Sequence, residues 1–414
     1  MISKNQPATS SVANAKRVLI AFTNVGVMTA ALMPDMLHRA GCHVTMMGKA
    51  SRRISVSWHY DKWIATPEDA TEIIKTITQI LERDPSAFDW VILCDDLLLR
   101  AVQDLELPTA IAARLCAIRN AEALETLGSK TATAAFLDAK GIRVPPFKIC
   151  KNTDEIPAAA EALGFPVMVK LDRSQNASGV FPCKNSGDIA LNTEKYTGDK
   201  FQVEKFVEGE QIGVEPLYID GKLLAYISGK IIKTDRVTGL ETWRRSYDDP
   251  AFIPILKHLG ECLRLNGFCN LGFIKSKADG TYYLFEADFR PNAWISADEH
   301  YGVDFATALK RYWNNPTDEI KLQTPQSGQD VRIFNREIEQ YIRERNGPAL
   351  GAWLKNTGNC WRFLPSDNPG FVVRTLLRLI FAPTIKGIKQ KLFPKNKEVI
   401  IEKMAPLPHE IQHI

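Results

Sequence analysis

Two carboxylates and an arginine on one short segment are the first candidates for chemistry. Glu286, Asp288 and Arg290 alternate along YYLFEADFRPN, whose apolar residues predict a strand. Alternate residues of a strand face the same side, so the two carboxylates project together and Arg290 continues their face if the strand persists. Adjacent like charges are unfavourable unless a cation lies between them, and Mg²⁺ prefers carboxylate and phosphate oxygens. Spacing alone supports a metal–nucleotide face and a solvated face with a local ion pair about equally.

Two lysines and a loop form a second group of candidates. Lys170 ends the apolar run FPVMVKLD, where a buried cation needs a partner, and Lys130 follows Gly128-Ser129. Taken alone, Lys170 is better interpreted as a strand-end lysine whose amine reaches water. Loop 172–180, DRSQNASGV, is small and polar. Backbone N–H groups of such a loop can surround phosphates, but the loop by itself is weak evidence for a phosphate site.

The elements that would position these residues fall into successive blocks. After a polar leader, residues 1–16, apolar runs at 17–22, 43–47 and 90–94 alternate with helical patterns. This alternation predicts a βαβ domain with a parallel sheet over 17–125. Residues 126–322 predict an α+β domain with a helix at 130–140 and a hairpin turning at Asp279-Gly280. The expected strands of this block are 167–171, 201–207, 213–218, 223–228, 271–276 and 282–287, with a further helix at 254–265. Residues 323–414 form a C-terminal region with few signals.

Composition places the chain among ordinary globular proteins. It has 414 residues, 45% hydrophobic and 24% charged, enough for two or three domains. A formal charge of +4 gives no support for nucleic-acid binding. The eight cysteines form no CxxC pair, and the histidines show no metal-binding spacing. The polar leader lacks the apolar core of a signal peptide, so we expect a cytoplasmic protein.

The order of these segments resembles the ATP-grasp superfamily. The resemblance rests on Lys130 with GIRVP eleven residues later, FPVMVKLD and the loop after it, QVEKFVEGEQ, and the hairpin ADGTYYLFEADFRP. It covers about residues 17–320. It implies an α/β N-terminal domain with a βαβ parallel sheet, followed by a two-subdomain ATP-grasp core. It also implies ATP and Mg²⁺, with Mn²⁺ as an alternative metal.

Carried over by position, the resemblance implies roles for individual residues. The implied nucleotide-binding residues are Lys130, Lys170, Ser178, Gly179, Glu204, Phe206, Val207, Glu210 and Gln211. In this set the lysines contact phosphates, Glu204 and the backbone of Phe206 and Val207 hold adenine, and Glu210 or Gln211 binds ribose. Glu286 and Asp288 would be the metal ligands. Arg290 and Lys170 would be catalytic, with Arg290 steadying an acyl-phosphate.

Three departures from the family pattern accompany the resemblance. The family's E-x-N-P-R signature reads E-A-D-F-R-P here, with Asp288 at the asparagine position, and aspartate is also a good Mg²⁺ ligand. The family's earlier acidic metal ligand falls near Gly272 or Phe273, neither of which binds metal. The ribose position aligns better with Gln211 than with Glu210, and glutamine can still hydrogen-bond a hydroxyl.

Two basic segments remain outside these motifs. Residues 229–249 are expected to form a solvated charged loop, with the alternative that Arg244 or Arg245 binds a substrate carboxylate. Residues 371–397 carry seven basic residues and no acid, and Arg374, Arg378 and Pro383 interrupt the apolar run too often for a membrane span. The segment is a candidate for peripheral membrane or protein contact. A helix packed on the protein body is the more common alternative.

The resemblance implies an ATP-dependent ligase. A small carboxylate would be activated as an acyl-phosphate with release of ADP, and an amine or amino acid would then displace the phosphate. The alternatives are a bicarbonate-using relative that forms carboxyphosphate, a phosphate-transferring relative, and a nucleotide-binding regulator without catalysis. The absent acid near Gly272 keeps the regulator open. Expected partners are small-molecule carboxylate and amine substrates, and a homodimer is a candidate assembly.

Overall fold

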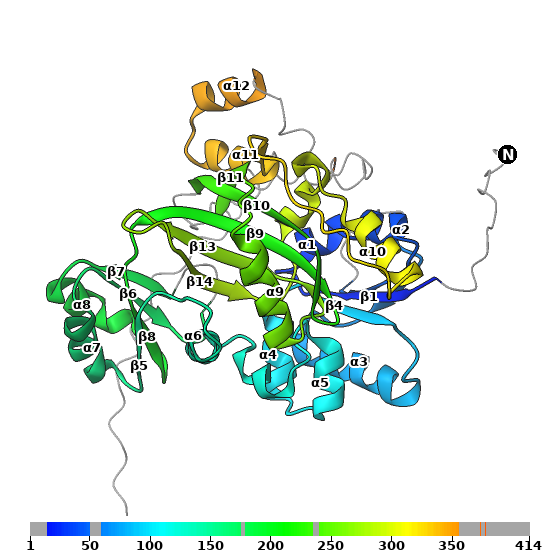
Figure 1. The fold of residues 1–414 in the computed structure, drawn as a ribbon, viewed down its shortest axis with the longest axis horizontal. Helices are drawn as coiled ribbons and strands as arrows, with labels where there is room; N and C mark the ends of the chain where they lie inside the picture. Colours follow the sequence, from blue (N-terminus) through cyan, green and yellow to red (C-terminus); the bar gives the residue numbers. More distant parts are fainter. Residues whose placement is uncertain are drawn as a thin grey trace, which may run out of the picture.

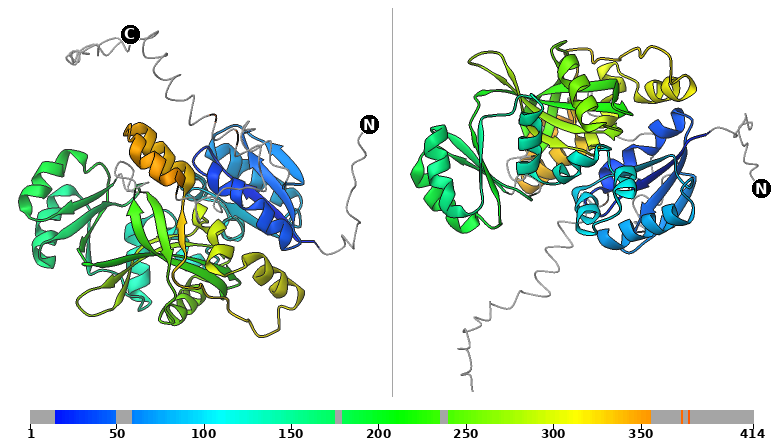
Figure 2. Two further views of the ribbon diagram at one scale, coloured as in Figure 1. Left: turned by 90° about the horizontal axis from the view of Figure 1, so that it is seen from above. Right: turned by 60° about the horizontal axis from the view of Figure 1, so that its bottom comes forward.

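The computed structural model describes residues 15–49, 59–174, 179–234 and 240–355, together with Val373 and Leu377. The chain forms an N-terminal domain with a parallel sheet, a small antiparallel sheet and a large antiparallel sheet (Figures 1 and 2). This is the predicted combination of a βαβ domain and an α+β core. The predicted domain boundaries at 125 and 322 stay predictions.

The N-terminal domain is a four-stranded parallel sheet in the order β3-β2-β1-β4. Its elements are β1 (Arg17–Ala21), α1 (Val27–Leu32), α2 (Pro34–Arg39), β2 (His43–Gly48), β3 (Lys62–Ala65), α3 (Ala70–Arg83), β4 (Trp90–Leu93), α4 (Asp96–Asp104), α5 (Thr109–Leu115) and the 3₁₀ helix η3 (Ala121–Thr126). The three predicted strands are present, and apart from the first residue of β1 and of β2 they are buried, because helices cover both faces of the sheet. Asp69 caps α3 by accepting from the Glu72 N–H.

The small sheet has the order β5-β8-β6-β7, and helices pack on one of its faces. Its elements are α6 (Lys130–Ala139), β5 (Phe147–Cys150), η4 (Thr153–Glu155), α7 (Ile156–Leu163), β6 (Val167–Leu171), β7 (Val180–Cys183), α8 (Ser186–Asn192), η5 (Thr193–Lys195) and β8 (Phe201–Lys205). Val167 and Val169 pack into the core under α7 and α8. Lys170, one position out of phase with them, therefore projects from the opposite face.

The large sheet has the order β14-β13-β9-β10-β11-β15, and the two-residue strand β12 also pairs with β9. Its elements are β9 (Gly209–Ile219), β10 (Lys222–Thr234), β11 (Glu241–Ser246), α9 (Phe252–Leu263), β12 (Gly267–Phe268), β13 (Asn270–Ser276), β14 (Tyr282–Asp288), η6 (Ala293–Ala297), η7 (Glu299–Tyr301), α10 (Phe305–Asn314), β15 (Asp330–Arg332), α11 (Phe334–Arg343) and α12 (Gly347–Lys355). One face packs on α9. The other face turns polar toward the β8–β9 end.

The charged segment 229–249 is largely strand, so its interpretation as a solvated loop is wrong. β10 continues through Thr234, and β11 (Glu241–Ser246) pairs with it antiparallel. Along β11 buried residues alternate with more exposed ones, as expected for a strand. The high content of charged residues made this alternation hard to recognise in the sequence. β15, beyond residue 322, pairs with β11 and extends the same sheet.

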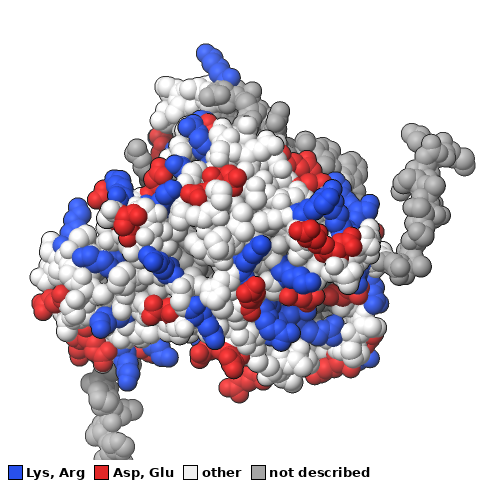
Figure 3. Space-filling view, in the orientation of Figure 1, with Lys and Arg blue, Asp and Glu red and all other residues white. Residues whose placement is uncertain are grey.

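The surface and the C-terminal region show no feature that points to a function among the described residues. On the face shown in Figure 3, basic and acidic side chains are interspersed over the described residues. Among those residues, no helix is both long and apolar enough to cross a bilayer. Apart from Val373 and Leu377, the basic segment 371–397 lies outside the described residues, so its proposed surface contact stays a prediction.

One buried carboxyl group of this fold leads to a pH-dependent prediction. Burial raises the pKa of Asp298 to about 7, although its carboxylate accepts the Phe305 N–H at 3.2 Å. Below the unfolded pKa, near 4, this carboxyl group is protonated in both states and does not destabilise the fold. Between pH 4 and 7 the unfolded state ionises first, so the free energy of unfolding falls as the pH rises, and above 7 the loss is complete. The free energy of unfolding of Asp298→Asn, relative to the wild type, should therefore rise from pH 4 to 7 and then level off.

Urea denaturation at several pH values measures this difference. Asp304→Asn is the matched control, because the pKa of Asp304 is lowered by its capping of α10, with hydrogen bonds from Thr307. Its difference from the wild type should be constant between pH 5 and 8. A flat profile for Asp298→Asn over the same range would contradict the prediction.

Candidate active site

Lys130 is held at the start of α6 by the segment that follows β6. Its Nζ donates to the carbonyl oxygen of Ser174 at 2.9 Å and to the Ser174 hydroxyl at 3.1 Å. The Asp172 carboxylate accepts from the Ser129 hydroxyl and from the Thr131 N–H, both at 2.8 Å. Burial lowers the pKa of Lys130. Asp172 thus fixes the helix start beside the predicted phosphate loop.

Lys170 is buried and has the partner that a buried cation needs. Its Nζ lies 2.7 Å from Glu204 Oε1 on β8, and both side chains are almost fully covered. The same Nζ donates to the Phe285 carbonyl oxygen of β14 at 2.9 Å. The strand-end interpretation, with the amine in water, is therefore wrong for Lys170. The contact joins the small sheet to the large one, and the candidate site lies where the two sheets meet (Figure 1).

Glu286 and Asp288 lie together near this junction, as the sequence predicted. The side chain of Glu286 is exposed at the surface of the site. Nearby protein atoms that displace water from its carboxylate, together with the charge of Asp288, raise its pKa to about 7. Lys170 and Lys130 act in the opposite direction on Glu286. Burial also raises the pKa of Asp288. The negative charges of two neighbouring carboxylates repel each other. A divalent cation bound to their oxygens would neutralise that repulsion, so the pair is suited to bind one. No cluster of three or more acidic, histidine or cysteine side chains suited to a metal occurs among the described residues.

Arg290 is held between two carboxylates from different domains. Its Nε and Nη2 donate to the two oxygens of Asp96 at 2.5 and 2.9 Å, and Nη2 also donates to Asp288 Oδ2 at 3.0 Å. Asp96 is the first residue of α4 in the N-terminal domain. Asp288 and Asp96 raise the pKa of Arg290 against the opposing effect of burial. The guanidinium is therefore permanently charged and fixed in orientation.

The strand register shows which of the alternative residues lie on the same face of the sheet as Glu286. Gly272 is directly paired with Glu286 and with Gly213 of β9, whereas Phe273 is fully buried in the core. Gly272 thus occupies the position beside Glu286 where the family's earlier acid was expected. Gln211 lies two residues before Gly213, so it shares the Glu286 face, whereas Glu210 faces the other side.

The remaining predicted nucleotide residues are placed as follows. Glu210 forms an ion pair with Lys230, at 2.8 Å. The N–H of Phe206 donates to the Pro166 carbonyl oxygen at 3.1 Å, so this nitrogen is already used. Gly179 lies so close to Ser174 that a Cβ would fall 2.4 Å from the serine Cβ, which explains a glycine there. Val207 is half-buried beyond β8, and Ser178 lies outside the described residues.

Arg244 and Arg245 point to opposite faces of β11. Arg244 is 1% exposed and its Nη1 donates to both oxygens of the fully buried Glu215, at 2.7 and 2.9 Å. It is also paired with Glu241, and the Trp294 ring lies over its guanidinium at 4.4 Å. A Cβ at Gly213 would fall 2.2 Å from Arg244 Cζ, so the glycine makes room for the arginine. Arg245 is half-exposed and pairs with Asp330, away from this cluster.

A hydrogen-bonded chain links the Arg244 cluster to the predicted metal ligands. Asn292 Nδ2 donates to Glu215 Oε1 at 3.0 Å and to Asn270 Oδ1 at 2.8 Å. Asn270 Nδ2 in turn donates to Asp288 Oδ2 at 3.1 Å. Sequence reasoning missed Glu215, Asn270 and Asn292. The segment GVEPLYI gave a local signal for Glu215 alone, because an acid within an otherwise apolar strand needs a partner when it is buried.

Sequence reasoning also gave too little weight to Asp96. Asp95 and Asp96 directly follow the apolar run 90–94, where the sequence alone favours turn or helix-cap residues over a ligand site. Asp95 is the cap of α4, since it accepts the Leu98 N–H at 3.2 Å. Asp96 instead pairs with Arg290 across 194 residues of chain, and no local pattern reports such a contact.

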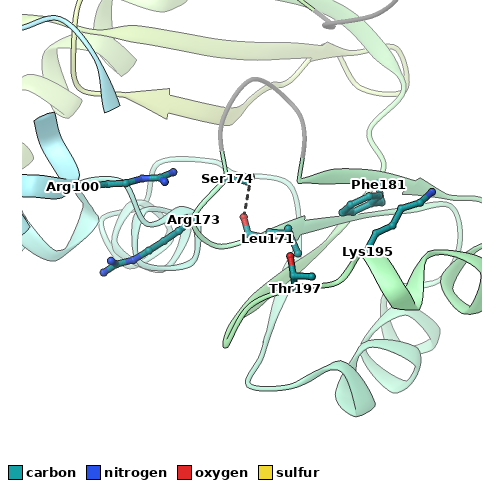
Figure 4. Close-up of a pocket in the computed structure, with 7 residues that line it drawn as sticks. All are labelled: Arg100, Leu171, Arg173, Ser174, Phe181, Lys195 and Thr197. Carbon is teal, nitrogen blue, oxygen red and sulfur yellow. Dashed lines mark hydrogen bonds between the residues drawn. The ribbon is translucent and has the colours of Figure 1, made fainter. Parts of the chain in front are cut away.

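A hollow lies beside the base of the 172–180 loop (Figure 4). Its volume is about 460 Å³, and it is lined by Arg100, Leu171, Arg173, Ser174, Phe181, Lys195 and Thr197. Ser174 is shared with the Lys130 contact. Otherwise the hollow is separate from the predicted site residues, none of which lines it among those the structure describes.

Comparison with known proteins extends these observations. No protein-family model matches the chain. Over 141 residues the chain is 27% identical to the L-arginine-specific L-amino acid ligase of Bacillus subtilis, a match that covers 31% of the chain and only 34% of that relative. The chain therefore aligns with about a third of the relative's length.

Solved structures match over most of the chain. An N5-carboxyaminoimidazole ribonucleotide synthetase in complex with ADP superimposes with a TM-score of 0.59 at 16% identity, covering 80% of this chain and 85% of that one. The biotin carboxylase domain of a Hydrogenobacter thermophilus 2-oxoglutarate carboxylase gives 0.57 at 14%, covering 76% and 73%. The L-amino acid ligase of Bacillus licheniformis gives 0.52 at 19%, covering 72% and 74%. These structures are ATP-grasp enzymes, and the shared architecture shows that this chain has the ATP-grasp fold.

Proposed function

We propose that the chain is an ATP-dependent ligase that activates a small carboxylate and couples it to an amine or amino acid. The observation that carries the proposal is the convergence of Lys130, Lys170, Glu286, Asp288 and Arg290 where the two antiparallel sheets meet. These residues come from three separate segments of the chain, the start of α6, β6, and β14 with the residues that follow it. Cations suited to phosphates next to paired carboxylates are the chemical requirement of phosphoryl transfer from a metal–nucleotide complex.

The nucleotide would lie between the small and large sheets. Lys130 and Lys170 would bind its phosphates, with the β8–β9 connection beside the base and Gln211 beside the ribose. Glu286 and Asp288 fit a divalent cation, Mg²⁺ or Mn²⁺, because both are carboxylates that repel each other without one. Such a cation neutralises phosphate charge when bound.

The chain's residues would then support two successive substitutions. A carboxylate oxygen of the first substrate attacks the γ-phosphorus, forming an acyl-phosphate as the bond to ADP breaks. The amine nitrogen attacks the acyl carbon, inorganic phosphate leaves, and the amine gives up a proton. Arg290 would face charge that grows on the oxygens during both steps, and its fixed orientation avoids the cost of reorganising it. Closure of the sheets on each other would protect the acyl-phosphate from water.

We place the amino-acid substrate next to the Arg244 cluster. This choice is supported by its connection to Asp288 through Asn292 and Asn270, and by the two L-amino acid ligases among the similar proteins. Arg244 is retained as a candidate carboxylate-binding residue, which would have to act with its Glu215 pair intact. Arg245 is not retained, because it faces away from Glu286.

ADP release from Mg-ATP with pooled amino acids and small carboxylates tests the proposal. Release that needs both a carboxylate and an amine supports a ligase, and separating the pool then identifies the substrates. Release that needs bicarbonate instead would support the carboxyphosphate-forming alternative; the similar biotin carboxylase domain is a complex with bicarbonate. ATP binding without release under any pool would favour a nucleotide-binding regulator. Absence of ATP binding would overturn the whole site.

A further inference from the structure

An ion pair between domains lies directly beside the predicted metal ligands. Asp96 of the N-terminal domain takes two hydrogen bonds from Arg290, which follows β14 of the large sheet. Both side chains are largely covered, at 18% exposure for Arg290 and 23% for Asp96. Arg290 also binds Asp288, so Asp96 lies one side chain away from the candidate metal site.

Asp96 is held rigidly by the fold around it. Its neighbour Asp95 is buried and accepts from the N–H of Thr23 at 2.7 Å, from the Thr23 hydroxyl at 3.0 Å and from the Leu98 N–H. These bonds tie the start of α4 to the end of β1. The two domains also share one apolar core, in which Trp90 of β4 stacks on Phe268 of β12 with ring centroids 6.1 Å apart. The position of Asp96 relative to Arg290 is therefore set by packing across the domain boundary.

The contacts leave one side of the guanidinium for a ligand. Arginine has five N–H donors, and the hydrogen bonds to Asp96 and Asp288 use Nε and the two on Nη2. The two donors on Nη1 take no part in these bonds. With Nε and Nη2 fixed by two carboxylates, the plane of the guanidinium and the direction of Nη1 are fixed as well.

We propose that Asp96 is a positioning residue for Arg290. Through it, the N-terminal domain contributes to catalysis. Asp96 holds Arg290 with Nη1 directed at the oxygens on which charge develops during acyl-phosphate formation and breakdown. Removing its carboxylate leaves Arg290 bound by Asp288 alone, free to rotate about that contact. Displacement of a positioned group by about 1 Å can lower a rate about 100-fold. This inference rests on the proposed ligase function.

The test compares Asp96→Asn with the wild-type full-length chain, using the substrates that the pooled assay identifies. We expect kcat to fall about 10- to 100-fold while the KM for Mg-ATP and the melting temperature change little. We also expect less ligated product per ADP released, because a poorly held acyl-phosphate is lost to water. Asp104→Asn is the matched control, since Asp104 ends the same helix, is exposed and lies 3.5 Å from Arg173. It should behave as the wild type.

A second variant separates positioning from a purely structural link between domains. In an Arg290→Lys background, Asp96→Asn should cause little further loss, because the group that it positions has already been replaced. A lower melting temperature with kcat and product yield unchanged would overturn the inference, as would equal effects of Asp96→Asn in both backgrounds. Absence of turnover in the wild type would instead overturn the proposed function, and the inference with it.

Discussion

Replacing Glu286 by Gln should lower ADP release from Mg-ATP by at least about 100-fold, the loss typical of removing one group that stabilises transition-state charge. The amide has the same shape but neither the charge nor the second anionic oxygen that a divalent cation needs. The free energy of unfolding, by contrast, should stay the same or increase. Because the pKa of Glu286 is raised to about 7, its ionised form is unfavourable in the unliganded protein, and a neutral side chain removes that cost.

The combination of lost turnover with unchanged or higher stability separates a metal ligand from a structural acid. Turnover and thermal unfolding, both at pH 8, would be measured for Glu286→Gln and for the control Glu261→Gln. Glu261 is an exposed residue near the end of α9, on a different element from Glu286. Turnover near the wild-type value in Glu286→Gln would contradict the metal-ligand role. A large loss of stability would show that Glu286 has a structural function.

Replacing Arg244 by Met should destabilise the fold by about 3–5 kcal/mol, the cost of leaving one member of a buried ion pair without its partner. Glu215 is fully buried, and burial already raises its pKa even with Arg244 present. The same change at Arg245 should cost far less, because its pair with Asp330 is exposed to solvent. Arg244 and Arg245 are neighbours in β11. Any effect of the substitution on the strand itself should therefore be similar in the two variants.

Chemical denaturation of both variants measures the difference in the free energy of unfolding. Adding Glu215→Gln to Arg244→Met should restore part of the loss, because the double variant no longer buries an unpaired carboxylate. Equal stability of the two single variants would contradict the buried pairing. If Arg244→Met remains folded, its KM for the amino-acid substrate tests the substrate role separately from stability.

Local sequence patterns predicted the strands that carry the chemistry, because each pattern is set by burial on that element alone. FPVMVKLD is β6 with Lys170 out of phase with its core valines, and YYLFEADF is β14 with its two acids. The same reasoning failed for β11, where charged residues alternate with covered ones. Arg244 was taken for a loop residue, since burial of an arginine depends on a partner, Glu215, that lies 29 residues earlier.

The sequence by itself therefore determined the fold class, the order of elements and the residue types that can bind phosphates and a metal. Hydrophobic periodicity and motif order are local properties, and they remain visible without coordinates. Only the tertiary structure decided which charges are paired. It showed that Lys170 is neutralised by Glu204, that Gly272 rather than Phe273 faces Glu286, and that Asp96 binds Arg290. These facts depend on strand register and domain packing, which bring together residues far apart in the chain and leave no local trace in the sequence.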